Sequence, residues 1–143
     1  MTEIKSFEIV ESDLPAVAAE ILSFGKSETI FLFSGQMGSG KSALIFELCR
    51  KLGVGSNLSS PTFSIVNRYG TLENKTIFHF DLYRLKSLSE CMHIGLEEYL
   101  QSGNHCFIEW PEIAMVLMPP HSIHIQINVL DGEKRRLSVA RLP

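Results

Sequence analysis

The pattern of apolar and polar positions predicts a β-hairpin near the end of the chain. Residues 123–129 carry isoleucine or valine at every second position, and residues 137–139 resume this alternation. A period of two is typical of a strand with one buried face. The Asp131-Gly132 pair between the two runs indicates a turn, so we expect two antiparallel strands here.

The start of the chain predicts a strand followed by a helix. Residues 4–10 have strand-like composition, and Ser12 or Asp13 can cap a helix that Gly25 would close. The apolar stripe of this helix consists of Val17, Ala18, Ile21 and Leu22. A strand and a helix thus precede the most apolar segment of the chain.

That segment, residues 30–33, leads into a glycine-rich loop. Four consecutive apolar residues are typical of a buried strand. After the loop, apolar residues recur at the spacing of a helix, at Ala43, Leu44, Ile45, Leu48 and Leu52. Strand, loop and helix therefore follow one another around residues 35–42.

Residues 63–69 and 75–83 predict a second, longer antiparallel hairpin across residues 70–74. Its second strand has two faces, with Phe78, Phe80 and Leu82 on one and His79, Asp81 and Tyr83 on the other. The second face is polar and ionisable.

A helical region over residues 87–100, which Gly95 divides, precedes a short strand over residues 106–108. This strand delivers Glu109 and Trp110 at its end, where Pro111 stops the ladder. An acidic residue at the end of a buried strand is the Walker-B arrangement.

Composition limits the possible classes of protein. With 143 residues, 45% of them hydrophobic, the chain suits a single domain over residues 1–143. A net charge of −3 argues against strong independent binding of nucleic acid. The three cysteines are widely spaced, so we expect buried reduced thiols. No run approaches a membrane span, which favours a cytoplasmic protein with access to ATP and Mg²⁺.

Candidate chemistry begins in the glycine-rich loop. Residues 35–42, Gly-Gln-Met-Gly-Ser-Gly-Lys-Ser, match the G-x-x-x-x-G-K-[ST] phosphate-binding pattern. In that pattern the backbone N–H groups of the loop surround the phosphates, and the helix N-terminus adds partial positive charge. We expect Lys41 to reach the β- and γ-phosphates and Ser42 to bind Mg²⁺. We also expect Lys41 to be exposed to solvent in the absence of nucleotide.

Phosphoryl transfer also needs a second metal anchor and an oriented attacking oxygen. Glu109 is the candidate anchor, with a plain surface acid as its alternative. Asp81 could hold metal-bound water, orient the attacking water or merely pair with Arg84. Thr62 resembles a switch threonine that senses the γ-phosphate.

Three further features leave alternatives open. Trp110, the sole tryptophan, packs beside the nucleotide, against a partner or in the core. His79 shares a face with Asp81, but no second histidine stands at metal-ligand spacing, so we assign it no catalytic role. The basic run 134–136 is either a solvated turn or a tRNA contact.

Taken together, these motifs resemble the TsaE family, also called YjeE, a bacterial ATPase of tRNA threonylcarbamoyladenosine biosynthesis. The resemblance rests on the glycine-rich loop and on four further blocks, Ser60-Pro61-Thr62-Phe63, residues 79–85 (His-Phe-Asp-Leu-Tyr-Arg-Leu), residues 95–99 (Gly-Leu-Glu-Glu-Tyr) and residues 108–111 (Ile-Glu-Trp-Pro). It implies an α/β fold of the P-loop NTPase kind, in three layers, with a central mixed β-sheet flanked by helices. Gln36 stands where an acid is usual and Ser42 where threonine is usual, which affects the expected affinity more than the expected activity.

The resemblance also implies the site and its partners. ATP and Mg²⁺ would bind with Gln36, Met37, Gly38, Ser39, Gly40 and Lys41 around the phosphates, Ser42 and Glu109 at the metal, Thr62 and Asp81 at the reacting end, Trp110 beside the site and Ser12 near the adenine. The leading strand and helix could instead only cover the sheet. The implied partners are the TsaB and TsaD proteins, with tRNA reached through their complex and ATP hydrolysis driving turnover.

Two other functions remain open from the sequence. A small-molecule kinase could use the same loop, since the motif alone does not separate hydrolysis from transfer to an acceptor. A nucleotide-dependent binding module, whose hydrolysis is incidental, is the third possibility.

Overall fold

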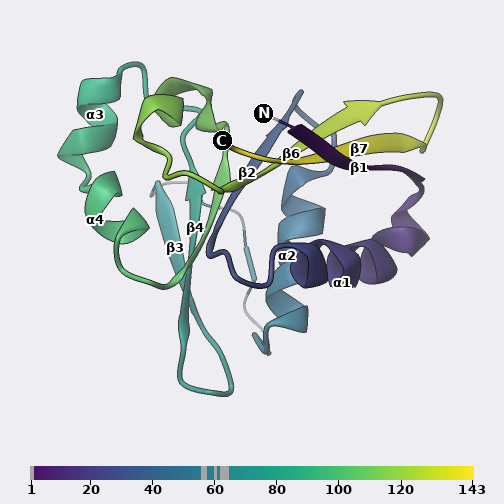
Figure 1. Cartoon of the computed structure of the whole chain (residues 1–143), viewed down its shortest axis with the longest axis horizontal. Helices are drawn as coiled ribbons and strands as arrows, with labels where there is room; N and C mark the ends of the chain where they lie inside the picture. Colours follow the sequence, from purple (N-terminus) through teal and green to yellow (C-terminus); the bar gives the residue numbers. More distant parts are fainter. Residues whose placement is uncertain (1, 56–57, 60, 62–64) are drawn as a thin grey trace.

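A computed structural model describes residues 2–55, 58–59, 61 and 65–143 of the chain, shown in Figure 1. The strands are β1 (Thr2–Ile9), β2 (Ile30–Gly35), β3 (Val66–Gly70), β4 (Thr76–Asp81), β5 (His105–Glu109), β6 (Ile123–Val129) and β7 (Arg135–Arg141). The α-helices are α1 (Leu14–Phe24), α2 (Lys41–Lys51), α3 (Leu88–His93) and α4 (Leu96–Leu100), and 3-10 helices span Glu11–Asp13 and Pro111–Leu117.

All seven strands form one mixed sheet in the order β1-β7-β6-β2-β5-β4-β3. The four central strands, β6, β2, β5 and β4, run parallel, whereas β1, β7 and β3 run antiparallel to their neighbours. Both hairpins expected from the sequence are confirmed, β3 with β4 and β6 with β7. Residues 63 and 64 of the predicted 63–83 hairpin lie outside the described part of the chain.

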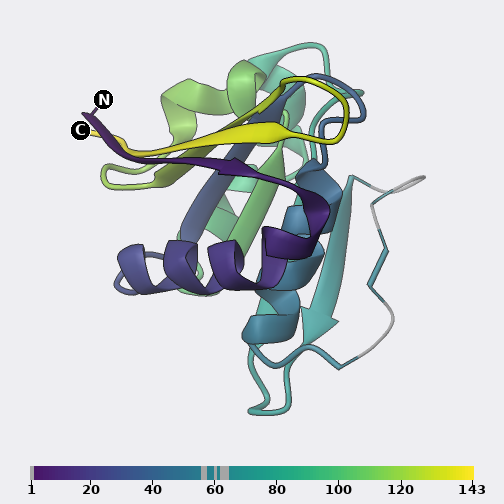
Figure 2. The same ribbon diagram turned by 90° about the vertical axis from the view of Figure 1, so that its right-hand side faces the viewer.

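Alternation along β2 divides the core into two clusters on opposite faces of the sheet. Phe31 and Phe33 pack with α1 and α2, while Ile30 and Leu32 pack with α3, α4 and the Pro111–Leu117 segment. Figure 1 shows α1 and α2 on one side of the sheet and α3 and α4 on the other, and Figure 2 shows the side with α1 and α2. The expected three-layer α/β fold is confirmed, and fully burying β2 on both faces explains its continuous apolar run.

Helix α1 ends as expected but starts differently. The Gly25 N–H donates to the carbonyl of Ile21 at 2.9 Å, closing the helix. At the other end, Asp13 stands at the cap position, but its carboxylate accepts from the N–H of Val10 at 2.9 Å. Asp13 thus holds the preceding turn and makes no side-chain cap bond.

The remaining helices and thiols follow the predicted pattern. Gly95, at φ +81°, separates α3 from α4. Cys49, Cys91 and Cys106 are buried free thiols, and burial raises the pKa of both Cys49 and Cys106 to about 12. Among the described helices, none combines the length and apolarity needed to cross a bilayer.

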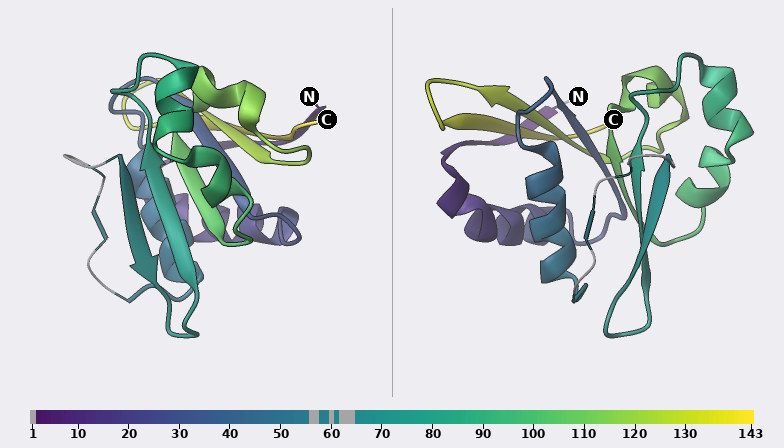
Figure 3. Two further views of the ribbon diagram at one scale, coloured as in Figure 1. Left: turned by 90° about the vertical axis from the view of Figure 1, so that its left-hand side faces the viewer. Right: turned by 180° about the vertical axis from the view of Figure 1, so that it is seen from behind.

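The parallel strands bring the predicted site residues to one edge of the sheet. Asp81 at the end of β4 is in register with Glu109 at the end of β5, and Phe33 of β2 pairs with Glu109 on its other side. Ligands in open α/β sheets bind at the carboxyl ends of strands. Figure 3 shows these strand ends from two further sides.

Candidate functional site

The glycine-rich loop, Gly35–Ser42, links the end of β2 to the start of α2. The Ser39 N–H donates to the Gln36 carbonyl at 3.1 Å, and the Leu44 N–H donates to the Gly40 carbonyl at 3.1 Å, where the helix begins. Gly38 and Gly40 have φ of +79° and +104°, and a Cβ at either position would meet nothing within 4 Å. Glycine is therefore needed here for backbone conformation, and the space beside the loop is open.

Lys41 does not project into solvent, which corrects the expectation from the sequence. Its side chain is only 5% exposed. The ammonium donates to the carbonyls of Gly35 and Gln36 and lies 4.0 Å from the centroid of the Trp110 ring. Burial lowers the pKa of Lys41, and the carboxylates of Glu109, Asp81 and Glu112 oppose this shift. Because the loop carbonyls and the ring surround the side chain, the site holds its cation in place.

Ser42 and Glu109 meet at the N-terminus of α2. The Ser42 hydroxyl lies 3.3 and 3.2 Å from the two carboxylate oxygens of Glu109 and donates to them. Glu109 is 4% exposed, so it is not a plain surface acid. No group of three or more His, Cys, Asp and Glu side chains in the described residues could hold a metal alone. Hydroxyl and carboxylate oxygens suit Mg²⁺, which commonly takes one or two protein ligands together with substrate phosphates.

Asp81 lies half-buried beside this pair. Its carboxylate accepts from the Tyr83 N–H at 3.0 Å, and no ion pair to Arg84 is present among the described contacts. Burial raises the pKa of Asp81, and Glu109 adds to the rise, whereas the Tyr83 hydrogen bond, His79 and Lys41 lower it. Asp81 therefore has greater proton affinity than an ordinary aspartate.

His79 is fully buried and contacts the candidate metal anchor, a role the sequence did not reveal. Its Nε2 donates to Glu109 Oε2 at 2.6 Å, and its Nδ1 lies in hydrogen-bond contact with the Tyr69 hydroxyl at 2.9 Å. Tyr69 in turn donates to the carbonyl of Ser59, and burial raises the pKa of its hydroxyl. The strand alternation around His79 placed it on the correct face but could not identify these partners.

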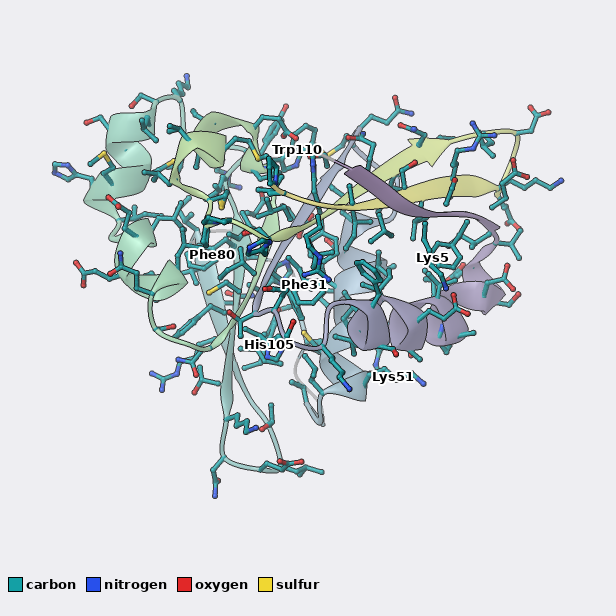
Figure 4. The ribbon with its side chains drawn as sticks, viewed as in Figure 1. Lys5, Phe31, Lys51, Phe80, His105 and Trp110 are labelled. Carbon is teal, nitrogen blue, oxygen red and sulfur yellow. The ribbon has the colours of Figure 1, made fainter. Side chains whose placement is uncertain are left out.

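Trp110 and Tyr83 form an aromatic wall over the loop. Their ring centroids are 4.8 Å apart, and Trp110 adopts a left-handed backbone conformation with φ +57°. Trp110 is partly exposed, and it is absent from both buried hydrophobic clusters. In Figure 4, Trp110 and His105 mark opposite ends of β5, with Phe31 and Phe80 in the interior. Tyr83 is 57% exposed and is a site residue that the sequence analysis missed.

These residues line one cleft of about 400 Å³. Its lining is Met37, Gly38, Ser39, Gly40, Lys41, Ser42, Ala43, Asp81, Tyr83, Glu109 and Trp110. Of the predicted residues, Gln36 contributes only the carbonyl that Lys41 contacts, and Thr62 lies outside the described residues.

A second pocket, of about 300 Å³, adjoins this cleft along Ser39, Gly40 and Ala43. The rest of its lining is Ile9, Val10, Glu11, Leu14, Leu44, Ile127, Glu133, Arg135 and Leu137. Ser12 does not line it and instead borders a neighbouring pocket, with Phe46 and Arg50, that shares Glu11, Leu14 and Ala43 with it. The adenine contact expected of Ser12 therefore remains a prediction, and the structure brings its neighbours Val10 and Glu11 closer to the loop.

Arg135 supports the loop from the closing hairpin. Its Nε donates to the Ser39 carbonyl at 3.1 Å, although 96 positions separate the two residues. Arg136 pairs instead with Glu8 at 2.9 Å. The basic run 134–136 is thus partly a structural support of the site, which neither interpretation of the sequence included.

Comparison with known proteins identifies the family. The family described as "Threonylcarbamoyl adenosine biosynthesis protein TsaE" matches residues 10–137. The protein named tRNA threonylcarbamoyladenosine biosynthesis protein TsaE from Rickettsia felis is 42% identical over 80% of this chain and 66% of its own length. The protein of that name from Rickettsia bellii is 37% identical over 96% of this chain and 92% of its own length.

A solved structure, that of Bacillus subtilis YdiB, has the same fold. It superposes with a TM-score of 0.78 at 19% identity, covering 100% of this chain and 89% of that one. Its low identity limits this comparison to the fold. The family match and the relatives, however, cover most of the sequence, so the chain belongs to the TsaE family of tRNA threonylcarbamoyladenosine biosynthesis proteins.

Proposed function

We propose that this protein is a Mg²⁺-dependent ATPase that serves tRNA threonylcarbamoyladenosine biosynthesis. One observation carries the proposal: Lys41, Ser42, Asp81 and Glu109 line the same cleft beside a loop with the phosphate-binding pattern. This combination provides a cation, oxygen ligands for a metal and a carboxylate of raised pKa. Such groups are the principal requirements of phosphoryl transfer.

Each residue of the cleft has a distinct role in the proposed reaction. The N–H groups of the glycine-rich loop and the N-terminus of α2 bind the phosphates, and Lys41 compensates their negative charge. Ser42 and Glu109 would hold Mg²⁺, which when bound neutralises charge that develops on the phosphate oxygens. Asp81 orients the attacking water or accepts its proton, and we retain Thr62 as a sensor of the γ-phosphate. Trp110 and Tyr83 restrict water at the outer side.

The adjoining pocket is our candidate for the nucleoside. It shares Ser39, Gly40 and Ala43 with the phosphate cleft, and its floor includes the apolar side chains of Ile9 and Ile127. Apolar walls with a few polar groups are typical of small-molecule sites. Val10 and Glu11 contribute to this pocket from the segment that precedes Ser12.

We further propose that the protein works in the cytoplasm with the TsaB and TsaD proteins and meets tRNA through their complex. Fast hydrolysis requires a cation at the developing charge besides the loop lysine, and a supplied arginine can accelerate GTPases by about 10³ to 10⁵. Among the described arginines, none lines the phosphate cleft. We therefore expect slow turnover by the isolated protein and a changed rate with its partners.

The small-molecule kinase remains the alternative enzyme. Incubation of labelled ATP with candidate acceptors separates the two, because a kinase yields a labelled product and an ATPase yields free phosphate. A binding module with incidental hydrolysis is distinguished by an Asp81→Ala variant that binds ATP without hydrolysing it. If that variant still supported multiple rounds of tRNA modification, hydrolysis would have no role in turnover.

The decisive experiment compares steady-state phosphate release by the wild type and Asp81→Ala, each alone and with saturating TsaB and TsaD. We expect Asp81→Ala to retain ATP binding and to lose the partner-dependent rate. Glu109→Ala should in addition lose its dependence on Mg²⁺. Fast turnover by the isolated wild type, unaffected by the partners, would contradict the proposal and favour the kinase.

A further inference from the structure

A chain of buried polar groups runs from the metal anchor away from the cleft. It consists of Glu109, His79, Tyr69 and the carbonyl of Ser59, joined by the contacts of 2.6 and 2.9 Å at the two nitrogens of His79 and by the Tyr69 hydrogen bond to Ser59. His79 is 0% exposed and Tyr69 6% exposed. The imidazole thus has a defined partner at each nitrogen.

Packing restricts the imidazole further. The Phe46 ring of α2 meets His79 edge-on with centroids 6.0 Å apart, and the Tyr69 ring lies 5.9 Å away. With both nitrogens bound and two aromatic neighbours, the ring has little rotational freedom. Its Nε2 is therefore a fixed donor directed at one oxygen of Glu109.

We propose that His79 is a positioning residue for Glu109, and that Tyr69 fixes His79 in the orientation this requires. A carboxylate that ligates a metal is commonly oriented by an outer hydrogen-bond partner, whose loss costs about 10- to 100-fold in metal affinity or activity. Ser42 meets the same carboxylate from the side of the helix. Glu109 is thus held between α2 and the β3–β4 hairpin. This inference rests on the proposed metal and nucleotide site.

Stability alone does not account for this chain of polar groups. Replacing both members of a buried hydrogen-bonded pair with apolar residues of similar volume is often neutral or stabilising. Ile77 and Phe107, which neighbour His79 on this face of the sheet, belong to an apolar cluster in which a hydrophobic side chain could pack. The Nε2–H group of His79 instead points at Glu109, the carboxylate that Ser42 also contacts. A role in orienting a metal ligand explains this placement.

The test measures metal binding directly, without turnover. ADP binding is measured by calorimetry in EDTA, and Mn²⁺ binding to the protein–ADP complex is measured by electron paramagnetic resonance of free Mn²⁺. We expect His79→Leu to weaken Mn²⁺ binding by about 10- to 100-fold. ADP affinity in EDTA should change by less than about twofold, because the variant retains Lys41 and the loop N–H groups that would bind the phosphates. His79→Gln, whose amide can still donate to Glu109, should recover most of the Mn²⁺ affinity.

Tyr69→Phe removes only the hydroxyl and provides a variant with minimal disturbance of packing. It should weaken Mn²⁺ binding in the same direction but less than His79→Leu. The matched controls are Tyr99→Phe, whose ring packs on Phe78 and Phe80 on the opposite face, and His105→Leu at the other end of β5. Both should leave Mn²⁺ and ADP affinities unchanged.

Two results would overturn the inference in distinguishable ways. If wild type binds ADP and Mn²⁺ and both His79→Leu and Tyr69→Phe, folded by circular dichroism, bind Mn²⁺ equally well, His79 is only a core residue. If the folded wild type binds neither ADP nor Mn²⁺ with ADP, the proposed function itself fails, and the inference fails with it.

Discussion

Lys41 shows how one side chain can be both the expected residue and unexpectedly placed. The pattern G-x-x-x-x-G-K-[ST] correctly locates a lysine at the start of α2. It does not reveal that the ammonium contacts two loop carbonyls and the face of Trp110. These contacts depend on β5, which places the tryptophan over the loop.

We predict that Lys41→Ala weakens ATP binding and abolishes hydrolysis. The loss in transition-state stabilisation should be about 2 to 4 kcal/mol, as for removal of one preorganised charge contact. Lys41→Met, which retains most of the stem, should lose activity similarly but should not lower the melting temperature, since the charge it removes is desolvated. Calorimetry and thermal unfolding measure the two effects. Unchanged hydrolysis in either variant would exclude the phosphate-binding role.

Asp81 provides a prediction of pH dependence. Its pKa in the folded state is raised above the ordinary 3.8, so the folded protein binds this proton more tightly than the unfolded chain does. The stability from this group is fully present below pH 3.8 and is lost as pH rises through the folded-state pKa. Asp81→Asn keeps an oxygen for the Tyr83 N–H and avoids the buried charge.

We therefore expect Asp81→Asn to melt at a higher temperature than wild type at pH 7, with the difference disappearing below pH 3.8. Unfolding curves of both proteins over a pH series test this. Glu97→Gln, on exposed α4 surface, is a control for the removal of one acidic charge. A variant less stable than wild type at pH 7 would show that the Asp81 charge is favourably paired. More stability with lost turnover would be a trade-off often seen at functional sites.

At the scale of elements, local patterns predicted the faces of strands but not their distant partners. Alternation in residues 76–83 places His79 and Asp81 on one face, as the structure confirms. Nothing local could pair β1 with β7 or bring Arg135 to Ser39, because these contacts arise from sheet order. Ser12, near the start of α1, borders a pocket that adjoins the loop pocket through Glu11, Leu14 and Ala43, and its contact with adenine stays a prediction.

Gly25, at the end of α1, lies close to the side chains of the sheet. A Cβ on Gly25 would lie 3.0 Å from both Ile123 and Phe31, although its φ of −98° suits any residue. We expect Gly25→Ala to destabilise the protein by about 1 to 3 kcal/mol, the usual cost of overpacking. Gly70→Ala is the matched control, since a Cβ there meets nothing within 4 Å. Denaturant unfolding measures the free energy of unfolding of both variants. Equal values for Gly25→Ala and Gly70→Ala would show that α1 can shift away from the sheet without cost.

At the scale of the whole molecule, surface charge limits the route to tRNA. The net charge is −3, and several basic side chains are paired with acids, as in Lys5–Glu20, Arg50–Glu47 and Arg136–Glu8. Binding to a nucleic acid backbone normally needs unpaired cations on one face.

We expect the isolated protein to retain no tRNA in filter binding at physiological salt and at protein concentrations up to about 10 µM. Addition of TsaB and TsaD should allow the protein to co-purify with tRNA. The control is Glu8→Lys, which replaces the acidic partner of Arg136 with a second cation. This variant should retain more tRNA nonspecifically. Strong, salt-sensitive retention of tRNA by the wild type alone would contradict the proposed indirect contact.

The order of strands has a consequence for synthesis on the ribosome. Strand β2, which leads into the glycine-rich loop, lies between β5 and β6, and both are translated long after it. Until residues 123–127 emerge, β2 lacks one of its two neighbours, and Phe31 and Phe33 lack part of their packing. Domains rich in distant pairings fold slowly and expose apolar strands meanwhile. A nascent chain of this protein therefore passes most of its synthesis with the apolar residues of β2 incompletely packed.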